Sequence, residues 1–496
     1  MSNVQRFILL PPRGTGASLL FRSAAEILTL FNEPTISSLR SAFGLKNTVA
    51  SKMKVVDSIA DQGAKLVEMT PEAMIALRGA LPGLRIVPEV FHHTLRAPRP
   101  EIIEPFRAKT RAAATGIKLT VKIGTGASAL PAVGATVVAF TNFAARQGAQ
   151  STTNAKGIVT LQLPQGTKIE QLYVYPVSGA WSYWKKNTVL KDDSILAVKP
   201  LDLTSVDGLQ ALMGRGTLEQ GAGVTVGVVD TGVGPHHDIP VAGGENTVAG
   251  EKPDQWQDNG EGHGTHVGGI IAARGGPSGL RGIAPGATIR SYRVFGATSK
   301  GASSFAIAKA IARAVEQGCD LINMSLGGGP ADEATQAAIA DARAAGVVVF
   351  AATGNDGRKP VSFPARYGMA VAVSACGRKG TFPSGTTETA DIAPPYGKDK
   401  HNFIAEFSNI GPETDVTGAG VGIISTYPND RYAVMSGTSM ACPAVCGVAA
   451  RLLASNSAVL TMARHQERSD LIAKLVFDAA VDLGFPPEMQ GTGLPR

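Results

Sequence analysis

The sequence predicts an α/β fold whose largest part is a parallel sheet with helices between its strands. Residues 224–229 form an apolar, β-branched run that is typical of a buried parallel strand. A second apolar run, at 347–352, follows a helical stretch at 331–345 that ends at Gly346, which completes a βαβ unit. Polar clusters that contain glycine follow both strands at their carboxyl ends, where open α/β sheets carry their chemistry.

Length and charge narrow the class of protein. The 496 residues are too many for one core, and 44% hydrophobic with 18% charged residues is the composition of a globular protein. The formal net charge of +7 comes from basic residues scattered along the chain, so we expect no nucleic-acid binding. No apolar run reaches the roughly 18 residues that a membrane span needs. The cysteines lack the spacing of a disulfide framework, and we expect them to pack in the core.

Residues 1–97 predict a small α+β domain. Apolar runs predict strands at 7–10, 54–56, 64–69 and 84–90, and helical patterns occur at 23–31 and 34–43. Thr70 and Pro71 are typical of a helix cap and a first helical residue, so a further helix begins there. Pro88 lacks the amide hydrogen that an inner strand needs, which limits the last strand to a sheet edge.

The next region predicts a β-sandwich. After a linker at 98–115, strands are predicted at 119–123, 134–140, 158–163 and 171–175, separated by glycine, proline, asparagine and serine clusters. No residue of this region suggests chemistry, so we interpret it as a spacer or a binding module.

Four side chains stand where nucleophilic catalysis would place them. Ser439 follows Gly437 and precedes an apolar run that predicts a helix from Cys442 to Leu453, and a helix N-terminus stabilises a developing anion. His263 begins another helix with glycines on both sides, which lets a second chain approach closely. Asp230 and Asn355 follow the two predicted strands, so one can orient a base and the other can donate to an oxyanion.

Each motif alone has a simpler interpretation. An aspartate at a strand end, such as Asp230, usually caps a turn, and Gly354-Asn355 alone is most often a turn. His263 and His266 suggest a zinc pair, but they lack the acidic partner of a zinc helix, so we interpret His266 as a packed helix histidine. The occurrence of all these motifs in one chain, in a fixed order, is what favours a catalytic site.

Together these motifs resemble the subtilisin-like serine proteases, the subtilases, over about residues 221–483. The resemblance rests on Asp230-Thr231-Gly232, His263-Gly264-Thr265-His266, Ser325-Leu326-Gly327-Gly328, Gly354-Asn355 and Gly437-Thr438-Ser439-Met440-Ala441-Cys442-Pro443. It implies a parallel sheet with helices on both faces. It also implies a catalytic triad of Ser439, His263 and Asp230, with Asn355 and the Ser439 N–H as the oxyanion hole. The substrate-binding residues that it implies are Ser325, Leu326, Gly327 and Gly354.

The two N-terminal regions have weaker resemblances. Segments 64–69 and 84–90 are similar to the inhibitory propeptides of subtilases, whose C-terminal tail, here 92–96, occupies the active-site groove. Segments 131–137 and 153–157 are similar to transthyretin-like or carboxypeptidase-regulatory modules. We therefore expect five parts: a propeptide-like domain at 1–97, a linker at 98–115, a β-sandwich module at 116–200, a catalytic domain at 201–485 and a C-terminal tail at 486–496.

The resulting hypothesis is a serine endopeptidase that cuts proteins or peptides through an acyl-enzyme and is made as a zymogen, with its own N-terminal domain as inhibitor. The alternative is a latent or non-catalytic scaffold or binding protein with the same fold. No acidic residue stands at Ser362 or at 351–353, which favours a large apolar or uncharged residue before the scissile bond. We expect a cis peptide bond before Pro364, beside the pocket that binds this substrate residue.

Cofactors and location follow from the resemblance and from the N-terminus. We expect no metal or cofactor in catalysis, while structural calcium is common in the family and Asp238 is a candidate ligand at most. Only a short apolar stretch precedes Pro11, shorter than the about 7–15 residues of a secretory signal core. We therefore expect a cytoplasmic protein, or export by a route that needs no such signal.

Overall fold

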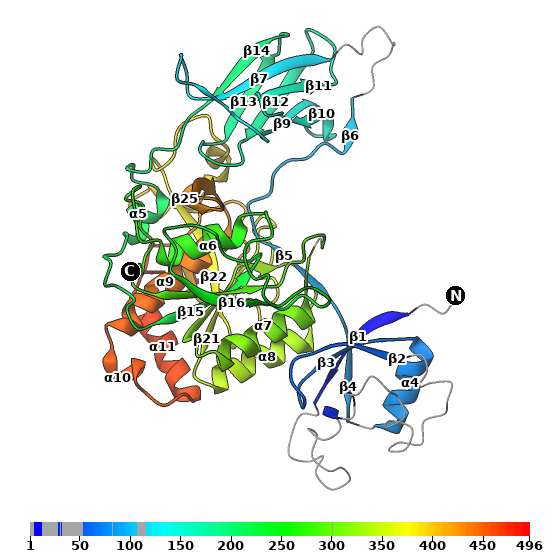
Figure 1. Cartoon of the computed structure of the whole chain (residues 1–496). Helices are drawn as coiled ribbons and strands as arrows, with labels where there is room; N and C mark the ends of the chain where they lie inside the picture. Colours follow the sequence, from blue (N-terminus) through cyan, green and yellow to red (C-terminus); the bar gives the residue numbers. More distant parts are fainter. Residues whose placement is uncertain are drawn as a thin grey trace.

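The computed structural model describes residues 4–11, 28–29, 31, 53–81, 83–106, 116–299 and 301–496. Figure 1 shows three units along the chain: a blue N-terminal sheet, a cyan β-module and a large unit coloured from green to red. The helices predicted at 23–31 and 34–43 fall outside the described residues except at 28, 29 and 31, so they stay predictions.

The N-terminal unit is an antiparallel sheet in the order β2-β3-β1-β4. Its elements are β1 (Gln5–Leu10), β2 (Met53–Ser58), β3 (Lys65–Met69), α4 (Pro71–Ala80) and β4 (Arg85–Pro88). The Thr70 hydroxyl caps α4 by accepting a hydrogen bond from the Ala73 N–H at 3.3 Å, as the sequence predicts. β4 lies at the sheet edge, so the missing N–H of Pro88 does not interrupt the hydrogen bonds of an inner strand. Among its described residues the unit is mostly strand.

One face of this sheet packs on two helices of the large unit, α7 (Ser304–Glu316) and α8 (Glu333–Ala344). Ile8 and Leu66 of the sheet share an apolar cluster with Phe305 of α7. Lys309 Nζ donates to both carboxylate oxygens of Asp57 at 2.9 Å at the rim of this contact. Burial of apolar area, with a charge pair at its edge, therefore docks the N-terminal unit.

The β-module is a pair of sheets packed around one apolar core. One sheet has the order β13-β12-β9-β10-β6, and the other has β11-β7-β14 with β8 beside β7. The strands are β6 (Glu104–Pro105), β7 (Ile117–Ile123), β8 (Leu130–Pro131), β9 (Thr136–Asn142), β10 (Gln147–Thr152), β11 (Ile158–Leu161), β12 (Lys168–Tyr175), β13 (Tyr183–Val189) and β14 (Ser194–Val198). The predicted strands leave out β10, β13 and β14. The edge strand β13 is polar and mostly exposed, so it carries no apolar alternation.

The large unit is built on a sheet in the order β16-β17-β15-β19-β21-β22-β23, with β24 beside β22. All pairings in it are parallel except that of β22 with β23. Its strands are β15 (Thr225–Asp230), β16 (Val241–Asn246), β17 (Thr288–Arg293), β19 (Leu321–Met324), β21 (Val348–Ala352), β22 (Val371–Arg378), β23 (Asn402–Ile404) and β24 (Val416–Ala419). The strands predicted at 224–229 and 347–352 are β15 and β21.

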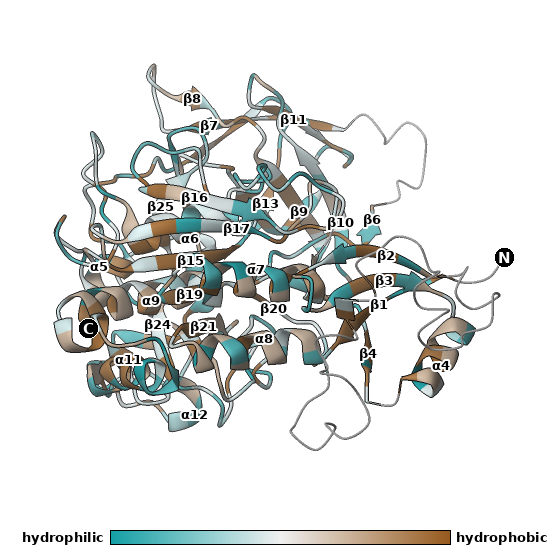
Figure 2. Cartoon of the chain, turned by 60° about the horizontal axis from the view of Figure 1, so that its bottom comes forward, coloured by the Kyte–Doolittle hydropathy of each residue, from teal (hydrophilic) through white to brown (hydrophobic). Residues whose placement is uncertain are grey.

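Helices cover both faces of this sheet, which confirms the predicted α/β class. Val226 and Val228 of β15 enter one core, and Val229 enters the other, because successive side chains of a strand point to opposite faces. The first core holds α6 (His263–Ala272), α9 (Thr438–Ala454) and α11 (Gln466–Asp478), and the second holds α7 and α8. Figure 2 shows the apolar strands enclosed between these layers.

Smaller elements complete the unit. They are α5 (Gly208–Met213), the 3₁₀ helix η3 (Thr387–Asp391), α10 (Ser457–Leu460), α12 (Pro487–Gln490) and the hairpin of β25 (Ile423–Tyr427) with β26 (Arg431–Met435). Residues 486–496, expected as a C-terminal tail separate from the catalytic domain, belong to the large unit, because β28 (Leu494–Pro495) pairs with β27 (Ala480–Val481) and Leu494 is fully buried. None of the helices in the described ranges combines the length and apolarity that crossing a bilayer requires.

Candidate active site

Ser439 lies in the first turn of α9, which begins at Thr438 rather than at the expected Cys442. Proline at 443 has no N–H for the carbonyl of Ser439, one turn earlier. The Ser325 hydroxyl satisfies that carbonyl instead, with an Oγ to O distance of 2.9 Å. The helix starts four residues before its apolar run. Because Pro443 leaves the Ser439 carbonyl free, this carbonyl can accept the hydrogen bond from Ser325 at the end of the neighbouring strand.

Asp230 and His263 form a fully buried pair between the end of β15 and the start of α6. His263 Nδ1 lies 2.7 Å from Asp230 Oδ1, which also accepts the Thr231 N–H at 2.7 Å. Among the described residues, His263 Nε2 has no hydrogen-bond partner. The carboxylate thus fixes one ring nitrogen and leaves the other available to take a proton.

A second aspartate, which the sequence motifs did not single out, shapes the loop before His263. Asp258 Oδ1 accepts the N–H groups of Gly260 and Gly262 at 2.8 Å, and Oδ2 lies 3.1 Å from the Thr265 hydroxyl. Burial raises the pKa of Asp258, although these hydrogen bonds oppose the shift. The pattern Asp-Asn-Gly at 258–260, typical of a turn, was the available signal.

His266 packs in the core, as expected. Its Nε2 lies 3.1 Å and 3.2 Å from the carbonyl oxygens of Ile423 and Ala433. Burial and the nearby His263 lower the pKa of His266 to about 3, so its imidazole stays neutral at ordinary pH. The ring therefore donates a structural hydrogen bond to the β25–β26 hairpin and is no second base.

Asn355 lies beside the serine on the loop after β21. Its Oδ1 accepts the Thr438 N–H and the Thr438 hydroxyl, both at 2.9 Å. Because Oδ1 makes these bonds, Nδ2 points away from Thr438, and this buried amide nitrogen has no partner in the described part of the chain. An unpaired buried donor is costly, so the geometry suits a group that receives a ligand oxygen.

The chain's own segment β5 (Phe91–Thr94) leads to these residues, because Leu95 follows it directly and contacts Ser439. It is the middle strand of a three-stranded antiparallel sheet, between β18 (Ala302–Ser303) and β20 (Leu326–Gly327). The tail predicted at 92–96 therefore lies where a substrate would add a strand.

Leu95 comes next and reaches the serine. The Ser439 N–H donates to the Leu95 carbonyl oxygen at 3.3 Å, and the Leu95 N–H donates to Ser439 Oγ at 3.1 Å and to the Ser325 carbonyl at 3.4 Å. The Leu95 side chain is only 8% exposed and lies against Gly327, where an added Cβ would come within 3.0 Å of it. A Cβ at Gly437 would lie 2.5 Å from the Leu95 carbonyl oxygen, so that approach requires glycine.

The predicted substrate-binding residues are thus not equivalent. Ser325, Leu326 and Gly327 contact the tail, whereas Gly354 lies against Ser362 and Asn409. A Cβ at Gly354 would come within 2.3 Å of the Asn409 side chain, so Gly354 acts on the packing of the loop. The Phe363–Pro364 bond beside this pocket is cis, as expected.

One predicted contact is not formed. Ser439 Oγ donates to the Ser325 carbonyl at 2.9 Å instead of to His263 Nε2. The hydroxyl also accepts the Leu95 N–H, so the bound tail holds it in this orientation. A rotation of the Ser439 side chain would be required to bring this hydroxyl to His263 Nε2.

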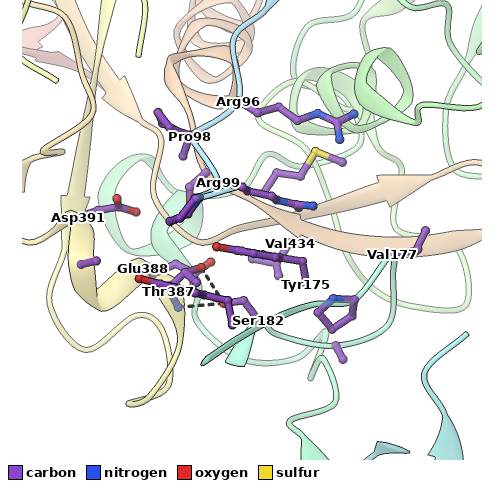
Figure 3. A pocket seen from close by; sticks show the side chains of 18 residues that line it. Arg96, Pro98, Arg99, Tyr175, Val177, Ser182, Thr387, Glu388, Asp391 and Val434 are labelled. Carbon is purple, nitrogen blue, oxygen red and sulfur yellow. Dashed lines mark hydrogen bonds between the residues drawn. The ribbon is translucent and has the colours of Figure 1, made fainter. Parts of the chain in front are cut away.

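The chain leaves the serine through a cavity of about 140 Å³ between the β-module and the large unit. Figure 3 shows Arg99 over the ring of Tyr175, and the guanidinium carbon lies 4.6 Å from the ring centre. Glu388 of η3 is buried and accepts a hydrogen bond from the Ser182 hydroxyl of the module at 3.1 Å. Burial and the nearby Glu388 raise the pKa of Asp391 well above its usual range. The β-module therefore forms part of the wall of this cavity, which the chain enters after it passes Ser439.

The residues near Asp238 fit calcium poorly. Ligand atoms of His236, His237 and Asp238 lie within 4.8 Å of one another, but imidazole nitrogens are not the oxygen ligands that calcium prefers. Asp238 Oδ2 also accepts the Tyr432 hydroxyl at 2.6 Å. The four cysteines, Cys319, Cys376, Cys442 and Cys446, are buried and unpaired, in agreement with core packing.

An α/β sheet with a helix-terminal serine, a buried Asp–His pair and an unpaired amide at one edge defines a protein of the serine hydrolase class. The Subtilase family model matches residues 221–493. Subtilisin DY of Bacillus licheniformis is 37% identical over 257 residues, which cover 51% of this chain and 83% of that protein. Subtilisin BL of Lederbergia lenta is 39% identical over 236 residues, 48% of this chain and 78% of that protein. M-protease of Shouchella clausii (strain KSM-K16) is also 39% identical over 236 residues, 48% of this chain and 55% of that protein. The chain belongs to the subtilase family and is a subtilisin-like serine endopeptidase.

Proposed function

We propose that this protease is a self-inhibited zymogen that cuts its own Leu95–Arg96 bond with Ser439 as nucleophile. The observation that carries the proposal is the Leu95 carbonyl, whose oxygen accepts the Ser439 N–H at 3.3 Å while β5 fills the substrate groove. The N-terminal unit is the inhibitor in this proposal, because its sheet docks on α7 and α8 and presents this segment.

The residues act in a fixed order. His263 Nε2 takes the proton of the Ser439 hydroxyl as Oγ attacks the carbonyl carbon, and Asp230 stabilises the imidazolium through Nδ1. The Ser439 N–H and Asn355 Nδ2 hold the oxyanion. His263 then gives its proton to the leaving amine, and water hydrolyses the acyl-enzyme by the same route in reverse. The substrates are peptide bonds in proteins, and neither metal nor cofactor takes part in this scheme.

Intact mass and N-terminal sequencing of purified wild type and Ser439→Ala test the proposal. We expect a new terminus at Arg96 in wild type only. Ser455→Ala, which changes a serine at the other end of α9, serves as the matched control and should be cut like wild type. A cut only between residues 198 and 221 would keep the protease assignment but reject Leu95–Arg96 as the processed bond.

One observation favours a second candidate, a plugged scaffold without proteolytic activity. The Ser439 hydroxyl is bonded to Ser325 and not to His263. If that orientation persists in solution, wild type will stay uncut and will not cleave added peptides. Cleavage seen only with Ser439 intact would reject this candidate.

A further inference from the structure

The segment in the groove shows which substrate side chains the protease encloses. Counting back from the Leu95–Arg96 bond, Leu95 is the first residue and His92 is the fourth. His92 is 0% exposed and Leu95 is 8% exposed, whereas Phe91 is 46% exposed and His93 is also exposed. Two side chains of the segment are therefore enclosed by the protein, and one of them is a histidine.

An acidic group meets this histidine. His92 Nε2 lies 3.2 Å from Asp332 Oδ2, and the Asp332 side chain is only 2% exposed. Among the described residues, His92 is the only hydrogen-bond partner of Oδ2. A buried carboxylate needs such a donor, so departure of the segment leaves Oδ2 directed at an empty subsite.

Asp332 is fixed before any substrate arrives. It is the N-cap of α8, and its Oδ1 accepts the Thr335 N–H at 2.6 Å. Its own N–H donates to the Tyr367 hydroxyl at 2.7 Å, and that hydroxyl donates to the Asp332 carbonyl at 2.8 Å. These bonds come from α8 and from Tyr367, so the carboxylate is held in the subsite by the protease itself and not by the segment.

The subsite also has the shape of an imidazole ring. Gly329 lies beside the ring, and a Cβ at this position would come within 2.8 Å of His92 Nδ1. A side chain at residue 329 would therefore exclude the histidine. The missing side chain and the fixed carboxylate act on the same substrate position.

We propose that Asp332 makes this protease select substrates with a histidine, or another basic side chain, four residues before the cut bond. This inference rests on the proposed function, because it takes the Leu95–Arg96 bond as the register of cleavage. An imidazole Nε2–H donates a hydrogen bond to the Asp332 carboxylate, whereas an apolar side chain leaves this buried carboxylate oxygen unpaired. Loss of such a bond corresponds to about a 10–100-fold change in kcat/KM.

The first test uses two peptides that copy residues 91–98, one with histidine and one with leucine at the place of His92. We expect the wild-type protease to cleave the histidine peptide with about 10–100-fold higher kcat/KM. Asp332→Asn keeps an N-cap side chain but removes the charge, and it should bring the ratio to within about threefold of one. Glu333→Gln changes the neighbouring carboxylate, whose side chain is 49% exposed and paired with Arg85, and should keep the wild-type ratio.

The second test needs no catalysis. Hydrogen exchange of the Phe91–Thr94 amides is measured in full-length Ser439→Ala, with His92→Leu and Asp332→Asn singly and together. We expect His92→Leu to speed exchange about 10–100-fold when Asp332 is present, and far less when it is asparagine.

The outcomes separate the two proposals. Coupled exchange without cleavage of either peptide would support the subsite and reject the protease register. A cleavage ratio near one in wild type, or a ratio that Asp332→Asn leaves unchanged, would overturn the proposal for Asp332. Exchange with no coupling between His92 and Asp332 would overturn it too.

Discussion

The segment that crosses Ser439 is held very differently on its two sides. Before the Leu95–Arg96 bond, β5 pairs with β18 on one side and β20 on the other, and His92 is enclosed. After the bond, the Ala97 N–H donates to the Ser436 carbonyl at 2.7 Å, and Arg99 lies exposed on a tyrosine ring. One half is a sheet strand, whereas residues 96–99 belong to no strand and are held by single contacts, among them a hydrogen bond of 2.9 Å from Arg96 Nη2 to the Glu261 carbonyl.

This difference suits the order of events in the acyl transfer that we propose for the Leu95–Arg96 bond. The half before the bond must stay while its carbonyl carbon is bonded to Ser439, and main-chain pairing holds it there. The half after the bond has to depart before water can attack, so strong contacts there would slow release. Five substitutions measure this contrast, beginning with the largest expected effect.

Ser439→Ala removes the proposed nucleophile, which cuts the bond between the two halves of the segment. We expect kcat for a peptide copying residues 91–98 to fall about a millionfold, the size known for subtilisin, a relative of this chain. Mass spectrometry of the products measures the loss and the bond cut. Undiminished hydrolysis by purified Ser439→Ala would reject the nucleophile and with it the division into two halves.

Asn355→Leu should act on the bond itself and on neither half. Its unpaired Nδ2 is suited to the oxyanion, so we expect kcat to fall about 10²–10³-fold, again the size known for subtilisin, with little change in KM. Steady-state kinetics with the same peptide separate the two constants. A rise in KM at unchanged kcat would show that Asn355 merely binds substrate.

Leu95→Asp and Ala97→Asp place the same charge on either side of the bond. Leu95 is buried against Gly327, so an unpaired carboxylate there should slow self-cleavage at least about a hundredfold. Ala97 is only half-buried, and we expect less than about tenfold slowing for Ala97→Asp. The rate at which the Arg96 terminus appears measures both, and equal slowing would contradict the asymmetry.

Arg99→Ala should have the smallest effect. A cation over a tyrosine ring contributes about 0.5–1 kcal/mol at an exposed site, so self-cleavage should change only about two- to fivefold. Lys186→Ala removes a similar contact, 4.6 Å from the Trp184 ring centre, and is the matched control without effect. A loss above about tenfold for Arg99→Ala would mean that the half after the bond is firmly held.

The sequence predicts where the candidate catalytic residues lie in the fold, because each stands in a short local pattern. Asp230 and Asn355 follow apolar strands, and His263 begins a helix between glycines, so secondary structure alone brings them to one edge of the sheet. The start of α9 was missed because proline at 443 is typical of a helix beginning, whereas here it lies inside the helix.

The two halves of the bound segment could not be predicted in the same way. Phe91–Thr94 has no apolar alternation and becomes a strand by pairing with segments more than two hundred residues away. Asp332 has the sequence pattern of an ordinary helix cap. Its place opposite His92 depends on how the N-terminal unit docks, and no local pattern records that.

The β-module gives a cut at Leu95–Arg96 an unusual outcome. It follows the bond in the chain and is anchored to the large unit, where the Trp184 N–H donates to the Gly385 carbonyl at 2.7 Å. The new amino terminus would therefore stay tethered beside the groove, at an effective concentration on the order of millimolar. Incoming substrates would compete with this tethered terminus, which dilution cannot remove. One cut would therefore let the segment before the bond leave, but not the segment after it.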